Sequence, residues 1–366
     1  MTKARKTNLF FLGVLAFYLL VCTCILPIIP NRYLNESSLA VLSQGLILFP
    51  GVVYVIANNG KPLNEIGIKR LGAGNVFLIM IYALLLVPLI SFVNSFSMLF
   101  AKNYIVGHLD SMSSNPFWLN LIIVAVMPAF VEEFTFRGII YTGYRNSTIK
   151  RAVAGSAVLF GAFHMNVNQF CYAVVMGIFF ALLYEATGSI YASMVAHFTF
   201  NANTLVLEEI TNASLNYIKK MAETDPEYEK LAEELINSES QSSITDYSLA
   251  EKIATLRSLF IVAIITTALA VLLLVFIAKR CNRKEHLSRV LSALSGSSRK
   301  EVATQNNEAT GFDNRVLSNQ EYQKKKDHDK EGYYIKQGYN GSEEYGGKIA
   351  DKVFIIGIIL CVCCML

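Results

Sequence analysis

Long runs of apolar residues, separated by short polar segments, dominate the chain up to about residue 280. Eight of these runs have about the 17–25 residues that a tilted helix needs to cross a hydrocarbon core about 30 Å thick. Only helices or closed barrels satisfy their backbone polar groups in lipid, so continuous runs of this kind predict membrane-spanning helices. The expected spans are 8–29, 38–57, 75–100, 118–140, 152–167, 168–186, 188–206 and 258–278.

The composition agrees with a membrane protein. Hydrophobic residues make up 53% of the 366 residues and charged residues only 16%, which is not the balance of an ordinary soluble domain. We therefore expect an all-α fold, a polytopic membrane bundle of about eight transmembrane helices, with the lipid bilayer as its immediate partner. The seven cysteines show neither metal-binding pairs nor a disulfide framework.

The positive charges of the short loops fall on one side of the predicted bundle. By the positive-inside rule this side is cytosolic, which places the N-terminus and the tail after the eighth span in the cytosol. The net charge of +4 reflects this asymmetry, so it predicts no binding to nucleic acid. The charges that set the orientation are Lys3, Arg5, Lys6, Lys61, Lys69, Arg70, Arg145, Lys150, Arg151, Lys279, Arg280, Arg283 and Lys284.

Three segments lie outside the eight spans. The loop 207–256 is acidic, and part of it near 216–237 is suited to form an amphipathic helix. The cytosolic tail 281–352 is rich in polar residues and is predicted to be disordered. The apolar segment 353–366 is too short to span comfortably, so we expect it to dip into the membrane or to pack on the bundle.

Two adjacent glutamates stand inside the fourth predicted span. A charged side chain at the centre of a membrane helix costs about 2.5–3.5 kcal/mol, so such residues normally face a protein interior or a water-filled cavity. Glu133 and Arg137 are four residues apart and share a helix face, where they can pair. Glu132 is rotated by roughly 100° from Glu133. We expect Glu133 to be structural, held by Arg137, and Glu132 to be free for chemistry.

Two further polar groups interrupt the fifth and seventh spans. Phe160 and His164 lie one helical turn apart, and so do His197 and Asn201, so the imidazole and the amide of the second pair point the same way. Each pair alone can be explained by hydrogen bonding and packing between membrane helices. Together with the two glutamates and the arginine, however, they make up a set of side chains of the kind that enzyme active sites use.

Water activated by these side chains could hydrolyse an amide without a covalent intermediate. Glu132 is the candidate general base, and His164 can orient or activate the water. His197 and Asn201 can donate hydrogen bonds to the oxyanion that develops on the attacked carbonyl. Glutamate and histidine are also zinc ligands, so zinc or another divalent metal on Glu132, His164 and His197 stays open, although the H-E-x-x-H spacing is absent.

Pro128, one turn before Glu132, can bend the fourth helix and open room for water. Counting along the helices at about 1.5 Å per residue puts Glu132 near mid-membrane or toward the cytosol. The same count puts His164 near the outer end of its span. The two side chains can meet only if the fifth span is shallow or the fourth helix is bent.

The three polar groups resemble the motifs of the CPBP family, which comprises CAAX proteases and bacteriocin-processing enzymes and is also called the Abi family. The family motifs E-E-x-x-x-R, F-x-x-x-H and H-x-x-x-N read here at 132–137, 160–164 and 197–201, in the family's order. The stretch 177–190 is similar to the family's lead-in to its third motif, and the resemblance covers about 115–206. It implies an all-helical intramembrane endopeptidase in which the six candidate residues have the roles given above. The family is described both as metalloproteases and as glutamate-dependent, metal-free enzymes.

The substrate that the resemblance implies depends on the branch of the family. The eukaryotic branch cleaves prenylated C-a-a-X proteins, whereas bacterial members are linked to peptide maturation, bacteriocin immunity or protein sorting. Short loops and compact motif spacing favour the bacterial branch, hence a bacterial cell membrane and a membrane-associated peptide or protein as substrate. Two alternatives are a non-catalytic membrane scaffold that binds an immunity target or sensor partner, and a proton- or ion-coupled transporter, although no transporter-type internal repeat is seen.

The chain accordingly divides into six parts, and the sequence predicts no oligomeric state. The parts are 1–112, N-terminal transmembrane helices; 113–206, a catalytic CPBP-type helical core; 207–256, an acidic extracytoplasmic loop; 257–280, the last transmembrane helix; 281–352, a disordered polar tail; and 353–366, an apolar C-terminal segment.

Overall fold

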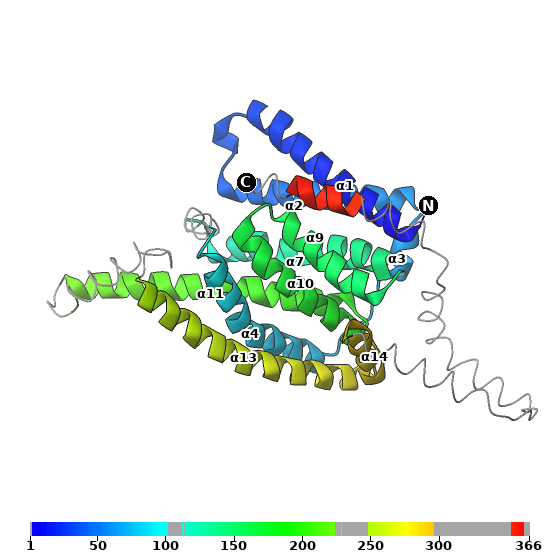
Figure 1. Ribbon diagram of the computed structural model, residues 1–366. Coiled ribbons are helices and arrows are strands. Elements are labelled where there is room, and N and C mark those ends of the chain that lie inside the picture. Colours follow the sequence, from blue (N-terminus) through cyan, green and yellow to red (C-terminus); the bar gives the residue numbers. More distant parts are fainter. Residues whose placement is uncertain are drawn as a thin grey trace, which may run out of the picture.

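The computed structural model describes residues 2–101, 112, 114–145, 147–223, 228, 248–295 and 353–361, and all regular secondary structure within them is helical (Figure 1). Six helical stretches in this part of the chain are long and apolar enough to cross a membrane, which confirms the predicted membrane bundle. They are Lys3–Ile28, Glu36–Ala57, Ala73–Ser97, Phe117–Arg145, Val167–Thr187 and Leu249–Arg280.

Several of these stretches contain turns of π- or 3-10 helix within or beside the α-helix. In chain order the elements are α1 (Lys3–Leu20), η1 (Val21–Ile25), η2 (Leu26–Ile28), η3 (Asn31–Tyr33), α2 (Glu36–Ala57), α3 (Lys61–Glu65), α4 (Ala73–Ser97), α6 (Phe117–Asn120), η4 (Leu121–Val126), α7 (Met127–Glu133), η5 (Phe134–Tyr141), α8 (Thr142–Arg145), η6 (Arg151–Gly155), α9 (Ser156–Phe163), α10 (Val167–Thr187), α11 (Ile190–Ala222), α13 (Leu249–Arg280) and α14 (Lys284–Ser295).

The fifth and seventh expected spans are helical but are not simple membrane crossings. The fifth is the short apolar stretch Arg151–Phe163, made of η6 and α9. The seventh is the first part of α11, which continues to Ala222 and projects beyond its neighbours in Figure 1. The first part of the segment 207–256, which we expected to be a loop, is therefore helix. Most of the amphipathic helix expected near 216–237 lies outside the described residues.

Two corrections concern the C-terminal part of the chain. The tail expected to be disordered over 281–352 contains α14, whose Leu287 and Val290 are buried; the rest of the tail, from residue 296, lies outside the described residues. Residues 353–361 form a helix beside α1, drawn in red in Figure 1. Its Phe354 ring lies edge-on to Tyr144, with 6.4 Å between the ring centroids. The expectation that this segment packs on the bundle is confirmed for these residues.

Side-chain caps define where several helices begin. The Asn35 side chain accepts from the backbone N–H of Ser38 at the start of α2, and the Asn166 side chain accepts from Gln169 N–H at the start of α10. Helix α13 begins with a capping box between Ser248 and Glu251. These short polar side chains satisfy backbone donors that the helix itself leaves free.

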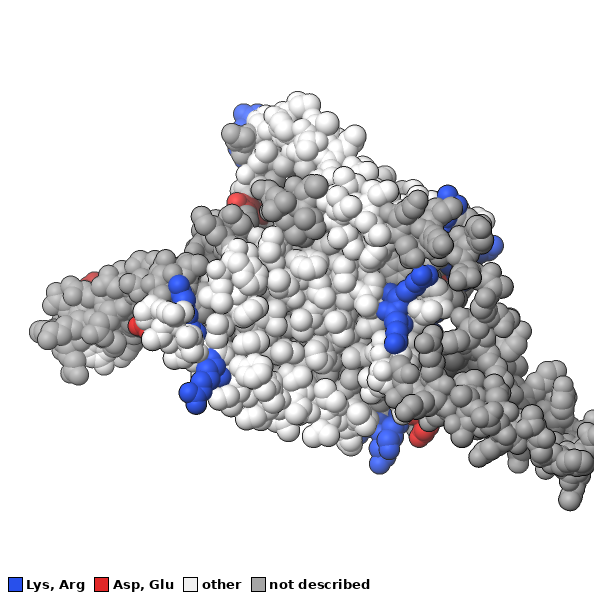
Figure 2. Space-filling view, viewed as in Figure 1, with Lys and Arg blue, Asp and Glu red and all other residues white. Residues whose placement is uncertain are grey.

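The stretch Phe117–Arg145 and helix α10 form the centre of the bundle. Within their most apolar windows, 44% and 61% of the residues are buried, against 22–28% in the other four candidate spans. Figure 2 shows a broad uncharged surface between lysine and arginine side chains at opposite sides of the view. The outer helices therefore present an apolar surface suited to lipid, and the central ones are shielded from it.

The buried carboxylate of Glu185 ties the end of α10 to η5, α8 and α14. Its Oε1 accepts from the Tyr141 hydroxyl at 2.7 Å, and its Oε2 accepts from Arg145 Nη2 at 3.0 Å. His286 of α14 is hydrogen-bonded to the same carboxylate, and Arg283 Nε donates to the Glu185 backbone carbonyl at 2.9 Å. This cluster holds α14 against the end of α10, and sequence analysis did not single it out.

Candidate active site

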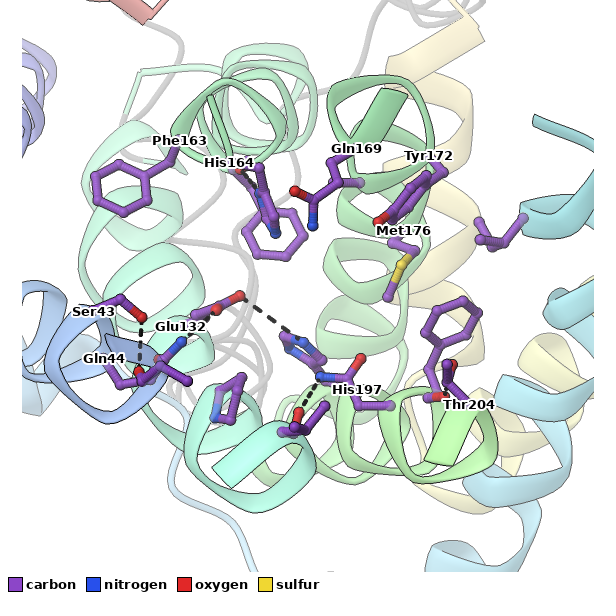
Figure 3. Close-up of a pocket in the computed structure, with 18 of the residues that line it drawn as sticks. Ser43, Gln44, Glu132, Phe163, His164, Gln169, Tyr172, Met176, His197 and Thr204 are labelled. Atoms are coloured by element: carbon purple, nitrogen blue, oxygen red, sulfur yellow. Dashed lines mark hydrogen bonds and ion pairs between the residues drawn. The ribbon is translucent and has the colours of Figure 1, made fainter. Parts of the chain in front are cut away.

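A cavity of about 650 Å³ lies among the central helices, and four of the six candidate residues line it (Figure 3). Glu132 comes from α7, His164 from the turn after α9, and His197 and Asn201 from α11. The other two candidates, Glu133 and Arg137, are fully buried behind the cavity wall. The structure thus brings all six residues to one place and separates a cavity-facing set from a supporting pair.

The supporting pair forms a buried ion pair that also reaches the third motif. Arg137 Nη1 lies 2.9 Å from Glu133 Oε1, and His197 Nδ1 lies 3.0 Å from the same oxygen. The Arg137 guanidinium lies over the Phe160 ring, 4.5 Å from its centroid, and Nη2 donates to the Gly177 carbonyl at 3.3 Å. Ion pairing, a cation–π contact and a backbone acceptor together compensate the buried charge.

The hydrogen bond to Glu133 determines how the His197 ring can act. A carboxylate only accepts, so Nδ1 of His197 carries the proton and donates. The other ring nitrogen, Nε2, lies 3.9 Å from Glu132 Oε2 and faces the cavity. When the ring is neutral, Nε2 accepts a hydrogen bond; it donates one only when the ring is protonated. An oxyanion role for His197 therefore requires the imidazolium, which the Glu133 carboxylate is placed to stabilise.

His164 is oriented by its own helix. Its Nδ1 lies 2.8 Å from the Phe160 carbonyl oxygen, and since a carbonyl only accepts, Nδ1 donates. The Phe160 ring lies edge-on to both imidazoles, with centroid distances of 5.0 Å to His164 and 6.0 Å to His197. This leaves Nε2 of His164 as the nitrogen that can accept a hydrogen bond from a water molecule.

Asn201 is anchored by the irregular helix that precedes the glutamates. Its Nδ2 donates to the Val124 carbonyl at 3.0 Å. In a regular α-helix that carbonyl would accept from residue 128, but Pro128 has no backbone N–H. Asn201 supplies this carbonyl with a donor that the Pro128 nitrogen does not offer. One N–H of the amide is thereby fixed, and the second remains for a ligand in the cavity.

The fifth helix is short, and this bears on how His164 can meet Glu132. Helix α9 ends at Phe163, and the chain turns at Met165, which has a positive φ of 49°. His164 therefore stops at the level of the cavity and faces it together with Glu132 (Figure 3). Of the features considered from the sequence, the structure shows a short fifth helix, Arg151–Phe163, and a fourth stretch that contains π-helical turns.

Sequence analysis missed Gln44 of α2. Its Nε2 donates to Glu132 Oε1 at 3.1 Å, and Gln44 is 8% exposed. The available signal was a pair of polar residues, Ser43 and Gln44, interrupting the apolar run 38–57. That signal could not identify a partner 88 positions away.

Metal binding by Glu132, His164 and His197 stays a prediction. No group of three histidine, cysteine, aspartate or glutamate residues in this part of the chain is arranged to hold a metal ion. Glu132, His164 and His197 share the cavity, but Glu132 Oε1 is bonded to Gln44. We therefore derive no reaction step through a metal.

The cavity-lining segment matches a known family. The family model described as "Rce1-like: Type II CAAX prenyl endopeptidase Rce1-like" matches residues 114–203, which contain all three motifs. The match confirms the resemblance to the CAAX proteases and places a segment of intramembrane-protease type at the centre of this chain. Neither the curated proteins nor the solved structures include a match to the chain.

Proposed function

We propose that the protein is an intramembrane endopeptidase that hydrolyses a peptide bond with a water molecule activated by Glu132, because residues 114–203 match the Rce1-like CAAX endopeptidase family model. The observation that carries this proposal is the convergence of Glu132, His164, His197 and Asn201 on one cavity. A structural bundle has no need of a carboxylate, two imidazoles and an amide facing a common space.

The proposed reaction proceeds by direct attack of water. Oε2 of Glu132 takes a proton as the water oxygen bonds to the carbonyl carbon, while Nε2 of His164 holds the other water hydrogen. The oxyanion that forms accepts from the second N–H of Asn201 and from protonated His197. The proton on Glu132 then passes to the leaving nitrogen as the C–N bond breaks. No covalent intermediate is formed, and the carboxylate returns to its starting state.

Glu133 supports this sequence through His197. The oxygen that accepts from His197 Nδ1 also pairs with Arg137, so two partners hold this one oxygen of the carboxylate. It fixes the ring orientation and compensates the positive charge on the imidazolium, much as a buried aspartate does in a hydrolase triad. Arg137 in turn keeps Glu133 ionised in an apolar interior.

The lining of the cavity supports an uncharged, membrane-associated substrate. Among the described lining residues Glu132 is the one carboxylate, and aliphatic and aromatic side chains such as Ile47, Ile90, Phe163 and Met176 form much of the wall. The family name refers to CAAX prenyl endopeptidases. A farnesylated peptide that ends in a C-a-a-X sequence is therefore the first probe to use, and we propose a membrane-associated peptide or protein as the natural substrate.

We further propose the orientation that the loop charges predict, with the N-terminus and α14 in the cytosol. Lys3, Lys61 and Arg283 belong to the side on which α14 docks onto Glu185. Cysteine labelling from each side of sealed vesicles tests this: a cysteine introduced at Lys61 should react with an impermeant reagent from the cytosolic side only.

The function is tested by comparing wild type with Glu132→Ala and His164→Ala in membranes. The farnesylated peptide and the endogenous peptides are followed by mass spectrometry. We expect products that appear with wild type and are lost in both variants, at equal amounts of folded protein. If wild type and both variants release the same peptides while a cellular phenotype of the wild type persists in both, the protein is a scaffold and the proposal fails.

A further inference from the structure

We propose that Gln44 is a positioning residue that holds the carboxylate of Glu132 in its reactive orientation. This inference rests on the proposed function and extends the active site to α2, which lies outside the segment 114–203 that matches the family. Gln44 does not touch the reacting atoms; it acts through Glu132.

The hydrogen bond has a defined direction. A carboxylate only accepts, so the group of Gln44 that faces Glu132 Oε1 at 3.1 Å is the NH₂. Gln44 is 8% and Glu132 9% exposed, so water competes little for this bond. A hydrogen bond to an ionised group in such surroundings is stronger than one between neutral groups.

The bond leaves one oxygen of Glu132 for chemistry. With Oε1 held by Gln44, Oε2 is the oxygen turned toward His197 Nε2, 3.9 Å away, and toward the cavity (Figure 3). A glutamate side chain has three rotatable bonds, and a displacement of about 1 Å in a reacting group can cost about 100-fold in rate. A donor on a neighbouring helix removes that freedom.

Helix α2 does not depend on Gln44 to reach the core. Near its start, Asn115 Nδ2 donates to Ser37 Oγ at 2.8 Å. Two turns after Gln44, Gly51 lies so close to the catalytic helix that a Cβ there would be 3.3 Å from Phe134 Cε1. Because contacts on both sides of Gln44 already fix α2, the amide is available to position Glu132 rather than to dock the helix.

The test uses the purified full chain in lipid nanodiscs with the farnesylated C-a-a-X peptide. Gln44→Met keeps the length and approximate volume of the side chain but removes the donor. Gln44→Asn keeps the amide on a shorter side chain, and Gln44→Glu replaces the donor with a second carboxylate. Ser37→Ala is the matched control, since it removes another hydrogen bond of α2 without touching Glu132.

We expect kcat to fall by about 10- to 100-fold in Gln44→Met with KM within about twofold of wild type. Gln44→Asn should retain more activity than Gln44→Met, Gln44→Glu should be at least as impaired, and Ser37→Ala should match wild type. If Gln44→Met fails to fold, the comparison of Gln44→Asn with Gln44→Glu carries the test.

Two results would overturn the inference, and they can be told apart. Wild-type kcat in Gln44→Met, or a loss of activity that only follows the loss of folded protein, refutes the role of Gln44 while Glu132→Ala remains inactive. If wild type and Glu132→Ala are indistinguishable on this peptide and on the endogenous peptides, the proposed function itself fails, and the role of Gln44 fails with it.

Discussion

Oε1 of Glu133 lies 3.0 Å from Nδ1 of His197, although the two residues are 64 positions apart in the chain and belong to different helices. The same oxygen pairs with Arg137 at 2.9 Å. One atom thus joins the first and third motifs, whereas the neighbouring Glu132 points into the cavity. The adjacent glutamates have different surroundings because a helix rotates them by about 100°.

This division predicts different outcomes for the same substitution at the two positions. Glu133→Gln should lower the free energy of unfolding by about 3–5 kcal/mol, because it leaves Arg137 buried without its counter-charge. Glu132→Gln should abolish cleavage and leave stability close to wild type. Thermal unfolding in detergent and peptide cleavage measure the two effects. A Glu133→Gln protein as stable as wild type would contradict the supporting role.

The amide of Asn201 depends on the proline that precedes the glutamates. An alanine in place of Pro128 would supply a backbone N–H for the Val124 carbonyl, which now accepts from Asn201. We expect Pro128→Ala to lower kcat by about 3- to 10-fold without loss of stability, since the oxyanion donor loses its anchor while the helix gains a bond. Asn201→Ala should lower kcat further, by about 100-fold. Equal kcat in wild type and Pro128→Ala would show that the anchor is unimportant.

A third prediction concerns the close packing of α10 against α9. A Cβ at Gly177 would lie 2.8 Å from Ala157 Cα, which is too close for the two helices to keep their separation. The Gly177 carbonyl also accepts from Arg137. Gly177→Leu should therefore yield little folded protein in size-exclusion chromatography. Gly13→Leu is the control, because nothing lies within 4 Å of a Cβ there.

The Glu185 cluster should contribute strongly to stability. Glu185→Gln would remove the buried carboxylate to which the partly exposed Arg145 and His286 are bonded, so we expect unfolding to become easier by about 1.5–3 kcal/mol. Glu65→Gln is the control, since Glu65 pairs with Lys3 at the exposed surface and such pairs contribute at most about 1 kcal/mol. Equal unfolding temperatures for the two variants would exclude the proposed difference.

The sequence predicted the membrane bundle, and it singled out six residues that the structure brings together, because both depend on local patterns. Apolar runs of spanning length reveal helices. Polar residues inside them are conspicuous because placing a polar side chain within a membrane is energetically costly. Gln44 was missed because a single amide in an apolar helix has many explanations until its partner in another helix is known. The same holds for Glu185, whose partners come from α8, η5 and α14. The continuation of α11 to Ala222 was missed because polar residues there indicated a loop, whereas helix formation itself does not require an apolar sequence.

The last prediction concerns metal. Among the described residues no group of three histidine, cysteine, aspartate or glutamate side chains is arranged around a common metal position, and His197 Nε2 lies 3.9 Å from Glu132 Oε2. A metal would require these side chains to move into a common coordination shell, with ligand distances of about 2 Å. We therefore expect a strong chelator to leave cleavage of the farnesylated peptide unchanged, and elemental analysis to find much less than one zinc per chain. If chelation stops cleavage and added zinc restores it, then Glu132, His164 and His197 rearrange around a metal, and the general-base role of Glu132 must be replaced by that of a ligand.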